Sequence, residues 1–83
     1  MKRADSAKIL ASIIKERRRD KALSQLDVGR LVGVRQATIS KLENNPGSTK
    51  LETLLRVMSA LGVGLYVEEK FVPVKNREWK EEW

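Results

Sequence analysis

Four side chains between residues 36 and 41 have the types and spacing to read the edges of DNA bases. Gln36, Ala37, Ser40 and Lys41 lie at positions i, i+1, i+4 and i+5, which on an α-helix share one face of roughly 140°. In a major groove, Gln pairs with adenine, Lys reaches guanine acceptors, Ala contacts the thymine methyl group and Ser bonds to either kind of edge. Arg35 adds a cation directly before them. We therefore expect base contacts from these five residues, with an ordinary solvated helix face as the alternative.

Two short helices joined by a tight turn would position these side chains. We expect the first to begin after Ser24, which opens a capping-box variant, and to end near Gly33, a typical residue after a helix. The second spans residues 36–44 and ends in a Pro-Gly turn. Such a pair with a short turn is the helix-turn-helix arrangement. Gly29 costs the first helix about 1 kcal/mol relative to alanine, which suggests that another helix approaches it closely.

Two further helices are expected to complete the core. One covers residues 6–21, is capped by Asp5 or Ser6, and ends in a basic run that suits the negative end of the helix dipole. The other follows a capping box over residues 49–52 and ends at Gly62. Its expected apolar face consists of Leu51, Leu54, Leu55, Met58 and Leu61. A membrane-surface helix is an alternative for residues 6–21, but three further core-forming helices favour packing.

The sequence pattern changes after residue 62. Residues 63–69 are β-branched, aromatic and partly alternating, which predicts a strand. A lone strand leaves its backbone groups unpaired, so we expect it to pair with the same strand of a second copy across a two-fold axis. An irregular C-terminal stretch is the alternative. The residues expected to form this dimer strand are Val63, Leu65, Tyr66 and Val67.

The expected fold is all-α, with a helix-turn-helix domain of four to five helices and one C-terminal strand that pairs across a dimer. We divide the chain into a DNA-binding domain at 1–62, a dimerisation strand at 63–71 and a flexible tail at 72–83.

Charge and composition limit the function classes. The 83 residues make one domain with a net charge of +6, of which residues 1–50 carry +7 and the rest −1. This indicates a polyanion partner for the first part, with a solvated basic surface as the alternative. The chain has no Cys and no His, so we expect no enzyme, no metal and no cofactor. No apolar run is long enough to cross a bilayer and the start lacks a secretory pattern, so we expect a cytoplasmic protein.

The stretch LSQLDVGRLVGVRQATISKLEN resembles the phage-repressor and Cro-like helix-turn-helix family, with residues 6–62 similar to the whole domain. Glycine replaces the usual alanine at Gly29, which keeps the side chain small. Arg35 stands where the family often has a Ser or Thr cap, so the start of the recognition helix departs from the family pattern and gains a cation.

The resemblance also implies roles for individual residues. It implies that Gln25 contacts a phosphate and braces Gln36, and that Arg18 and Glu43 form a structural ion pair between helices. We expect the phosphate contacts to come from Gln25, Arg30, Thr38 and Asn45.

The longer stretch RQATISKLENNPGSTKLETLLRVMSALGVGLYV, followed by a short tail that ends in Glu-Trp, resembles HipB-type antitoxins. The resemblance implies a HipA-like serine/threonine kinase toxin as partner, a palindromic operator duplex and autoregulation of the shared operon. Trp79 and Trp83 would then anchor the tail on the toxin, since tryptophan is enriched at binding hot spots. A tail that folds back on its own domain, a plain phage-type repressor and a protein-only antitoxin remain as alternatives.

Overall fold

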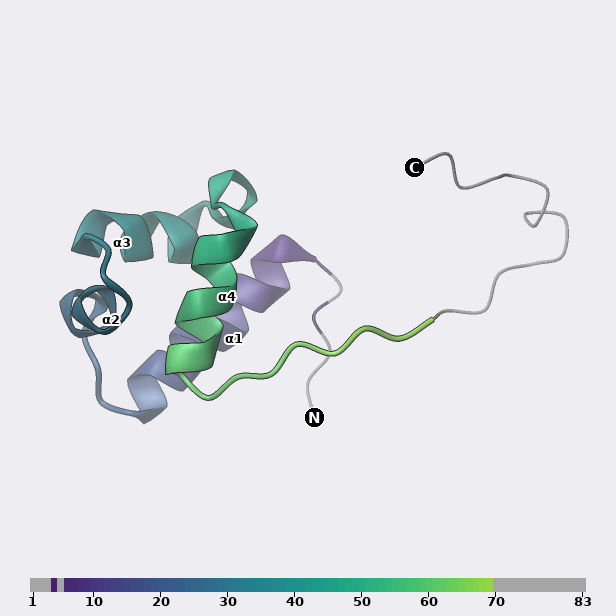
Figure 1. Cartoon of the computed structure of the whole chain (residues 1–83), viewed down its shortest axis with the longest axis horizontal. Coiled ribbons are helices and arrows are strands. Elements are labelled where there is room, and N and C mark those ends of the chain that lie inside the picture. Colours follow the sequence, from purple (N-terminus) through teal and green to yellow (C-terminus); the bar gives the residue numbers. More distant parts are fainter. Residues whose placement is uncertain (1–3, 5, 70–83) are drawn as a thin grey trace, which may run out of the picture.

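The computed structural model describes residue 4 and residues 6–69. This part of the chain folds into four α-helices and one short 3-10 helix (Figure 1). Their bounds are α1 Ala7–Asp20, α2 Gln25–Val32, α3 Gln36–Asn44, η1 Pro46–Ser48 and α4 Leu51–Ala60. No helix in the described ranges is both long and apolar enough to span a membrane.

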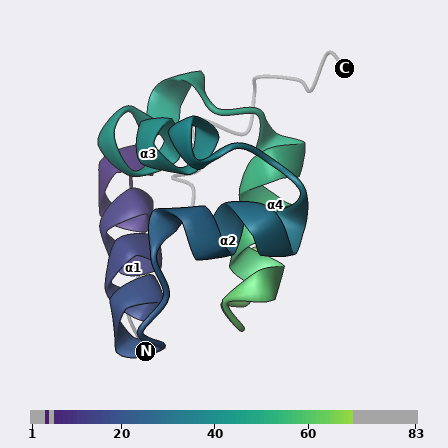
Figure 2. The same cartoon turned by 90° about the vertical axis from the view of Figure 1, so that its left-hand side faces the viewer.

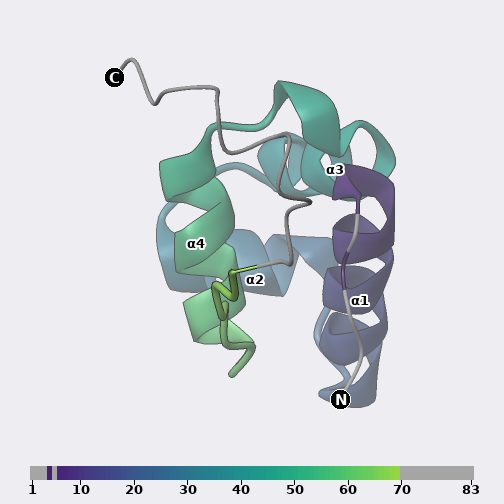
Figure 3. The ribbon, with the colours of Figure 1, turned by 90° about the vertical axis from the view of Figure 1, so that its right-hand side faces the viewer.

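The helices place α3 at one edge of the domain. In Figure 2, α2 crosses the view between α1 and α4, while α3 lies above α2 and is joined through η1 to α4. Seen from the other side, α1 and α4 stand in front of α2 and α3 (Figure 3). The residues of α3 contact α1, α2 and η1, so three elements together fix its orientation and leave its outer side open.

Local sequence signals explain where most helices begin and end. The Ser6 hydroxyl accepts from the Ile9 amide at the start of α1, as predicted. Ser24 and Asp27 form a complete capping box at the start of α2. Gly33 ends α2 with a φ of 80°, the left-handed conformation that glycine adopts at low cost. The predicted bounds of these helices and of α3 are confirmed to within one residue.

The capping box predicted over residues 49–52 is wrong. The N-cap residue of α4 is Lys50, and no side chain caps this helix. The preceding 3-10 turn explains the difference, because the Thr49 amide donates to the Pro46 carbonyl at 3.1 Å. A capping box needs the amide of its first residue for the acidic side chain, and here the turn has already used it.

The core lies between the four helices. Its fully buried members are Ile14, Val28, Ile39, Leu42, Val57, Met58 and Leu61. The apolar face predicted for α4 is therefore only partly buried, because Leu51 and Leu55 are 64% and 39% exposed. Spacing along a helix identifies an apolar face, but it does not say how far the rest of the same chain covers that face.

Residues 63–69 leave the domain as an extended segment (Figure 1). The segment begins with a Schellman motif, in which Gly62 has a φ of 72° and the Val63 amide donates to the Met58 carbonyl. Val63 packs against the core. No strand is assigned to residues 63–69, and a single described chain provides no second strand for pairing. The predicted dimer pairing therefore stays a proposal, and residues 70 and 71 of the predicted strand lie outside the described residues.

Candidate nucleic-acid interface

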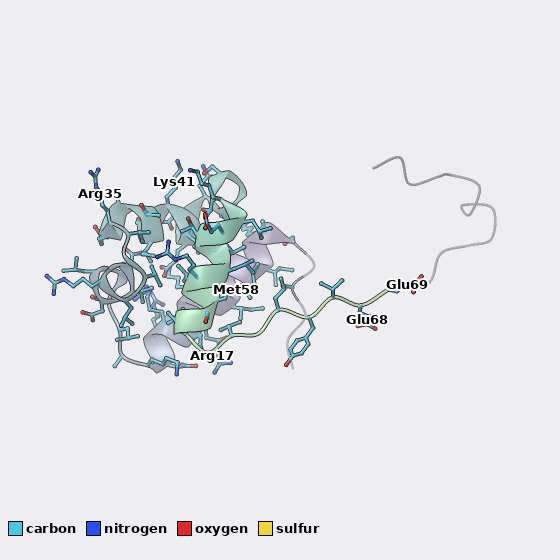
Figure 4. All side chains as sticks on the ribbon, in the orientation of Figure 1. Arg17, Arg35, Lys41, Met58, Glu68 and Glu69 are labelled. Atoms are coloured by element: carbon cyan, nitrogen blue, oxygen red, sulfur yellow. The ribbon has the colours of Figure 1, made fainter. Side chains whose placement is uncertain are left out.

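The outer side of α3 carries the side chains that the sequence assigns to base contacts. Arg35, Gln36, Ala37 and Lys41 are exposed, and Ser40 is partly exposed. Arg35 and Lys41 project from the edge of the domain, away from α2 and α4 (Figure 4). Arg35 is the N-cap residue of α3 and provides no side-chain cap, unlike the Ser or Thr that is common there in the family. The two exposed cations, Arg35 at the start of α3 and Lys41 in its last turn, favour an anionic partner for this face.

Gly29 allows α2 and the start of α3 to come close together. A Cβ atom at this position would lie 2.7 Å from the Val34 carbonyl oxygen and 3.4 Å from the Gln36 nitrogen. The Gly29 carbonyl in turn accepts hydrogen bonds from the amides of Gly33 and Val34, each at 2.8 Å. The predicted close approach is therefore present, and it comes from the backbone of the turn and the first residue of α3.

A buried ion pair joins α1 to α3. Arg18 Nε donates to Glu43 Oε2 at 2.6 Å, and Arg18 Nη2 donates to Glu43 Oε1 at 3.0 Å. The third guanidinium nitrogen, Nη1, donates to the Leu23 carbonyl at 2.8 Å, just before α2 begins. Only 1% of the Glu43 side chain is exposed. Because the pair is bidentate and desolvated, it fixes α3 relative to both α1 and the start of α2.

A chain of hydrogen bonds extends from this ion pair to the exposed face. Gln25 Nε2 donates to Glu43 Oε1 at 3.0 Å, and Gln36 Nε2 donates to Gln25 Oε1 at 2.6 Å. The Glu43 carboxylate can only accept, so the nitrogen of Gln25 must face it and the oxygen of Gln25 must face Gln36. The nitrogen of Gln36 must then point to Gln25, which leaves one N–H and the side-chain oxygen of Gln36 for a ligand.

Two opposing effects act on the charge of Glu43 in this ion pair. Burial favours the neutral form of Glu43, but hydrogen bonds from Arg18 and Gln25 and the Arg18 charge outweigh it and hold the pKa below its usual range. The hydrogen bond to Glu43 likewise raises the pKa of Arg18, against the effect of burial. Glu43 is therefore ionised at neutral pH and keeps its role as an acceptor.

Comparison with known families agrees with this geometry. A family model described as Helix-turn-helix matches residues 14–67, well over half of the chain. The chain belongs to the helix-turn-helix family. The matched range includes α2, α3, the turn between them and the Arg18–Glu43 pair.

Individual relatives include antitoxins. Antitoxin HipB of Escherichia coli O6:H1 is 34% identical over 56 residues, covering 68% of this chain and 60% of the relative. Antitoxin HigA1 of Mycobacterium tuberculosis is 39% identical over 62 residues, covering 75% of this chain and 42% of the relative. In a solved HipA-HipB-O2-O3 complex, one chain superposes with a TM-score of 0.79 and 28% identity, covering 86% of this chain and 100% of that chain.

These relatives confirm the predicted resemblance to HipB-type antitoxins. The chain spans 60% of the length of Antitoxin HipB of Escherichia coli O6:H1 and 42% of the length of Antitoxin HigA1.

The remaining predicted site residues lie at the ends of the helix-turn-helix pair. Arg30 on α2 and Asn45 after α3 are exposed, and Thr38 in the first turn of α3 is partly exposed. Their side chains make no hydrogen bond or ion pair with other described residues, so they remain available for phosphate oxygens. The structure gives no information on Trp79 and Trp83, which lie outside the described residues.

Sequence reasoning did not identify two other contacts in this helix-turn-helix domain. The Arg56 guanidinium of α4 donates to the Val32 carbonyl at the end of α2, where it satisfies a terminal carbonyl. Asn44 Nδ2 donates to the carbonyl and hydroxyl oxygens of Ser40. The i, i+4 spacing of Ser40 and Asn44 was a usable signal, whereas no local pattern connects Arg56 with a residue 24 positions away.

Proposed function

We propose that this chain is a sequence-specific duplex DNA-binding repressor and the antitoxin of a HipA-type kinase toxin, and that it regulates its own operon. The observation that carries the DNA-binding part is the hydrogen-bonded chain from the Arg18–Glu43 pair through Gln25 to Gln36. It holds a base-reading side chain in one direction on an otherwise exposed helix face. Membership of the helix-turn-helix family supports the same function.

The orientation of Gln36 suits adenine. With one N–H directed at Gln25, the remaining N–H and the oxygen match the N7 acceptor and the N6 donor on the major-groove edge of adenine. Arg35 and Lys41 add cations on the same side, and the small side chain of Ala37 allows the helix to approach the bases. Gln25 lies at the first position of α2, and the side-chain N–H that it does not direct at Glu43 is the proposed donor to a phosphate.

Fluorescence anisotropy tests the DNA-binding function with two duplexes, one from the promoter of the chain's own operon and one random. Gln36→Ala should weaken promoter binding by about 1–3 kcal/mol and relax specificity. Arg30→Ala, at an expected phosphate contact, should weaken both duplexes alike and reduce the slope of log affinity against log salt by roughly one. Equal affinity of the unchanged protein for both duplexes at every salt concentration would contradict a specific repressor.

The proposed dimer rests on the exposed apolar side chains of the extended segment. Tyr66 and Val67 are 82% and 93% exposed, and Leu65 is also exposed. An extended backbone with such side chains is suited to pairing with an identical strand. Pairing across a two-fold axis would direct two copies of α3 toward two half-sites of a palindromic operator, about one DNA turn apart.

Sedimentation at micromolar concentration tests this dimer. The unchanged chain should sediment as a dimer, and Leu65→Pro should shift it toward monomer, because proline removes a backbone donor from the strand pair. Ser59→Ala, on the exposed side of α4, provides the matched control and should stay dimeric. A monomeric unchanged chain would rule the dimer out.

The toxin part of the proposal rests on the HipB relatives. A solved complex holds HipB together with HipA, and the predicted tail of this chain contains Trp79 and Trp83. Calorimetric titration of a HipA-type kinase with the full chain and with a chain that ends at Val72 tests it. The full chain should bind more tightly, by 2 kcal/mol or more for a buried tryptophan anchor. Equal binding would leave the tail without this role.

The similarity to the antitoxin HigA1 makes a toxin other than a HipA-type kinase the second candidate partner. Binding to no HipA-type kinase, with intact binding to promoter DNA, would favour another toxin or a plain repressor. Toxin binding without any DNA affinity would instead favour a protein-only antitoxin.

A further inference from the structure

Asn44 contacts a residue that the proposed function places at the bases. It is the last residue of α3, one helical turn after Ser40, and it is exposed. Its Nδ2 donates to the Ser40 carbonyl oxygen at 2.9 Å and to the Ser40 hydroxyl oxygen at 3.2 Å. A single side-chain nitrogen therefore binds both oxygen atoms of Ser40.

The chemistry of the groups fixes the direction of these bonds. A carbonyl oxygen can only accept, so the atom of Asn44 that faces it must be the amide nitrogen and not the amide oxygen. The same nitrogen can only donate, so the Ser40 hydroxyl must accept from it. This occupies one of the two lone pairs of the hydroxyl. The hydroxyl donates to no other described residue, so its proton is left for a ligand.

We propose that Asn44 is a positioning residue that makes Ser40 a hydrogen-bond donor toward the base in front of it. The proposal rests on the proposed DNA-binding function and adds a specificity to it. A free serine hydroxyl both donates and accepts, so it bonds to either kind of base edge. Held by Asn44, the hydroxyl favours acceptors such as guanine N7 and O6, adenine N7 and thymine O4. It disfavours the amino group of cytosine.

Selection of binding sites from a randomised duplex library, with the full chain, tests this role. The unchanged chain should show a preference for acceptor edges at one base pair, and Ser40→Ala should remove it. Asn44→Ala should relax the preference at that same base pair, by roughly three- to tenfold as expected for one hydrogen bond. The base preference that depends on Gln36 should stay unchanged in Asn44→Ala. If the substitution instead loosened α3 as a whole, that preference would weaken as well.

The variant Asn44→Asp provides a sharper test because it keeps the shape of the side chain. A carboxylate can only accept, so it loses the bond to the Ser40 carbonyl oxygen and can hold Ser40 only by accepting the hydroxyl proton, which would leave a lone pair of the hydroxyl for the base. The preference at this base pair should then move toward amino groups, those of cytosine and adenine. The added negative charge should lower affinity for every duplex, and binding to a random duplex measures that effect separately.

Asn45→Ala is the matched control. Asn45 is the neighbouring amide and an expected phosphate contact, but it does not bond to Ser40. Its loss should weaken all sequences alike and leave the preference at the Ser40 base pair intact.

Several outcomes would overturn the inference while leaving the proposed function intact. They are an unchanged preference in Asn44→Ala and Asn44→Asp, an unchanged preference in Ser40→Ala, or a loss of preference at all base pairs alike. If Asn44→Ala does not fold, as judged by thermal melting, Asn44→Asp decides the case. If the unchanged chain selects no site at all, the proposed function itself has failed.

Discussion

The α2–α3 pair and the extended residues 63–69 both expose side chains, but they hold them in different ways. On α3, Gln36 is fixed by Gln25 and Ser40 is fixed by Asn44. In residues 64–69, no side chain hydrogen-bonds to any other described residue, and most of the apolar surface of Tyr66 is open. One region is complete within a single chain, whereas the other has the character of a surface that a partner covers.

This difference bears on how each region would bind. Side chains that are already held in the bound orientation lose little conformational freedom on binding, so more of the contact energy appears as affinity. An extended segment without internal contacts must be ordered by its partner, at a cost for each residue. We therefore expect changes in the α2–α3 pair to act within one molecule, and changes in residues 63–69 to act through association.

The largest expected effect comes from Arg18→Ala. It leaves the buried Glu43 carboxylate without its cation, which should lower the free energy of unfolding by about 3–5 kcal/mol. Urea unfolding at several chain concentrations gives the measurement. Val67→Ala is the comparison variant, because Val67 is exposed and would act only through a second copy. The loss in Arg18→Ala should be the same at every concentration, and the loss in Val67→Ala should not. The reverse pattern would contradict the division between the two regions.

A smaller loss is expected from Gly29→Val. The added side chain would meet the Val34 carbonyl oxygen, a backbone atom that moves only with the turn. We expect a loss of about 1–3 kcal/mol in thermal or urea unfolding. Gly47→Val is the matched control, since nothing lies within 4 Å of its Cβ position. Similar losses in both variants would show that the close approach of the turn is unimportant.

Acid should weaken the same ion pair. Because the pKa of Glu43 is lowered on folding, its contribution is complete above the unfolded value of about 4.3 and is lost as the pH falls through the folded value. Melting temperatures of the unchanged chain and of Glu43→Gln should therefore converge as the pH falls below about 4.3. Hydrogen bonds from Ser24 lower the pKa of Asp27 as well. Asp27→Asn serves as the control. When it is added to both proteins, their melting temperatures should still converge as the pH falls.

The smallest effect is expected at the end of α1. Ala22 is the one described non-glycine residue with positive φ, at 57°. Ala22→Gly relieves that strain, but glycine also gives the unfolded chain more conformational freedom. The free energy of unfolding should therefore rise by less than about 1 kcal/mol. Gly62→Ala, at a φ of 72° with open space around the Cβ position, should lose a similar amount. Calorimetric melting of both variants measures the two changes in stability. A gain in both variants, or a loss in both, would contradict this explanation.

Most of the fold could be predicted because its signals are local. The serine before α2, the glycine after it and the Pro-Gly turn after α3 each act within a few residues, and the bounds of α3 agree with them. The uncapped start of α4 could not be predicted, because a 3-10 turn competes for the Thr49 amide. Periodicity also gave no measure of how exposed Leu51 would be, because exposure depends on what else covers the helix.

The candidate site was predictable to a different extent. The exposed face of α3 follows from helical spacing alone. Arg18 and Glu43 are 25 positions apart, so no local pattern connects them, and their pairing came from the family resemblance. The contact of Arg56 with Val32 was not predicted at all. The DNA-contact roles assigned to the exposed side chains remain predictions.

The fixed direction of the Gln25 amide limits how this scaffold could acquire a new target. A polar residue at position 36 faces the side-chain oxygen of Gln25, so it pairs with that oxygen only if it offers a donor. Glutamine, asparagine, lysine and arginine meet this condition, whereas aspartate and glutamate, the residues that accept from cytosine, would set oxygen against oxygen. With residue 36 at a base, as proposed, retargeting by exchange of α3 alone would therefore be biased toward purines at that base pair. A redesign for cytosine would have to replace Gln25 together with residue 36, which makes these two positions in separate helices a single unit of evolutionary change.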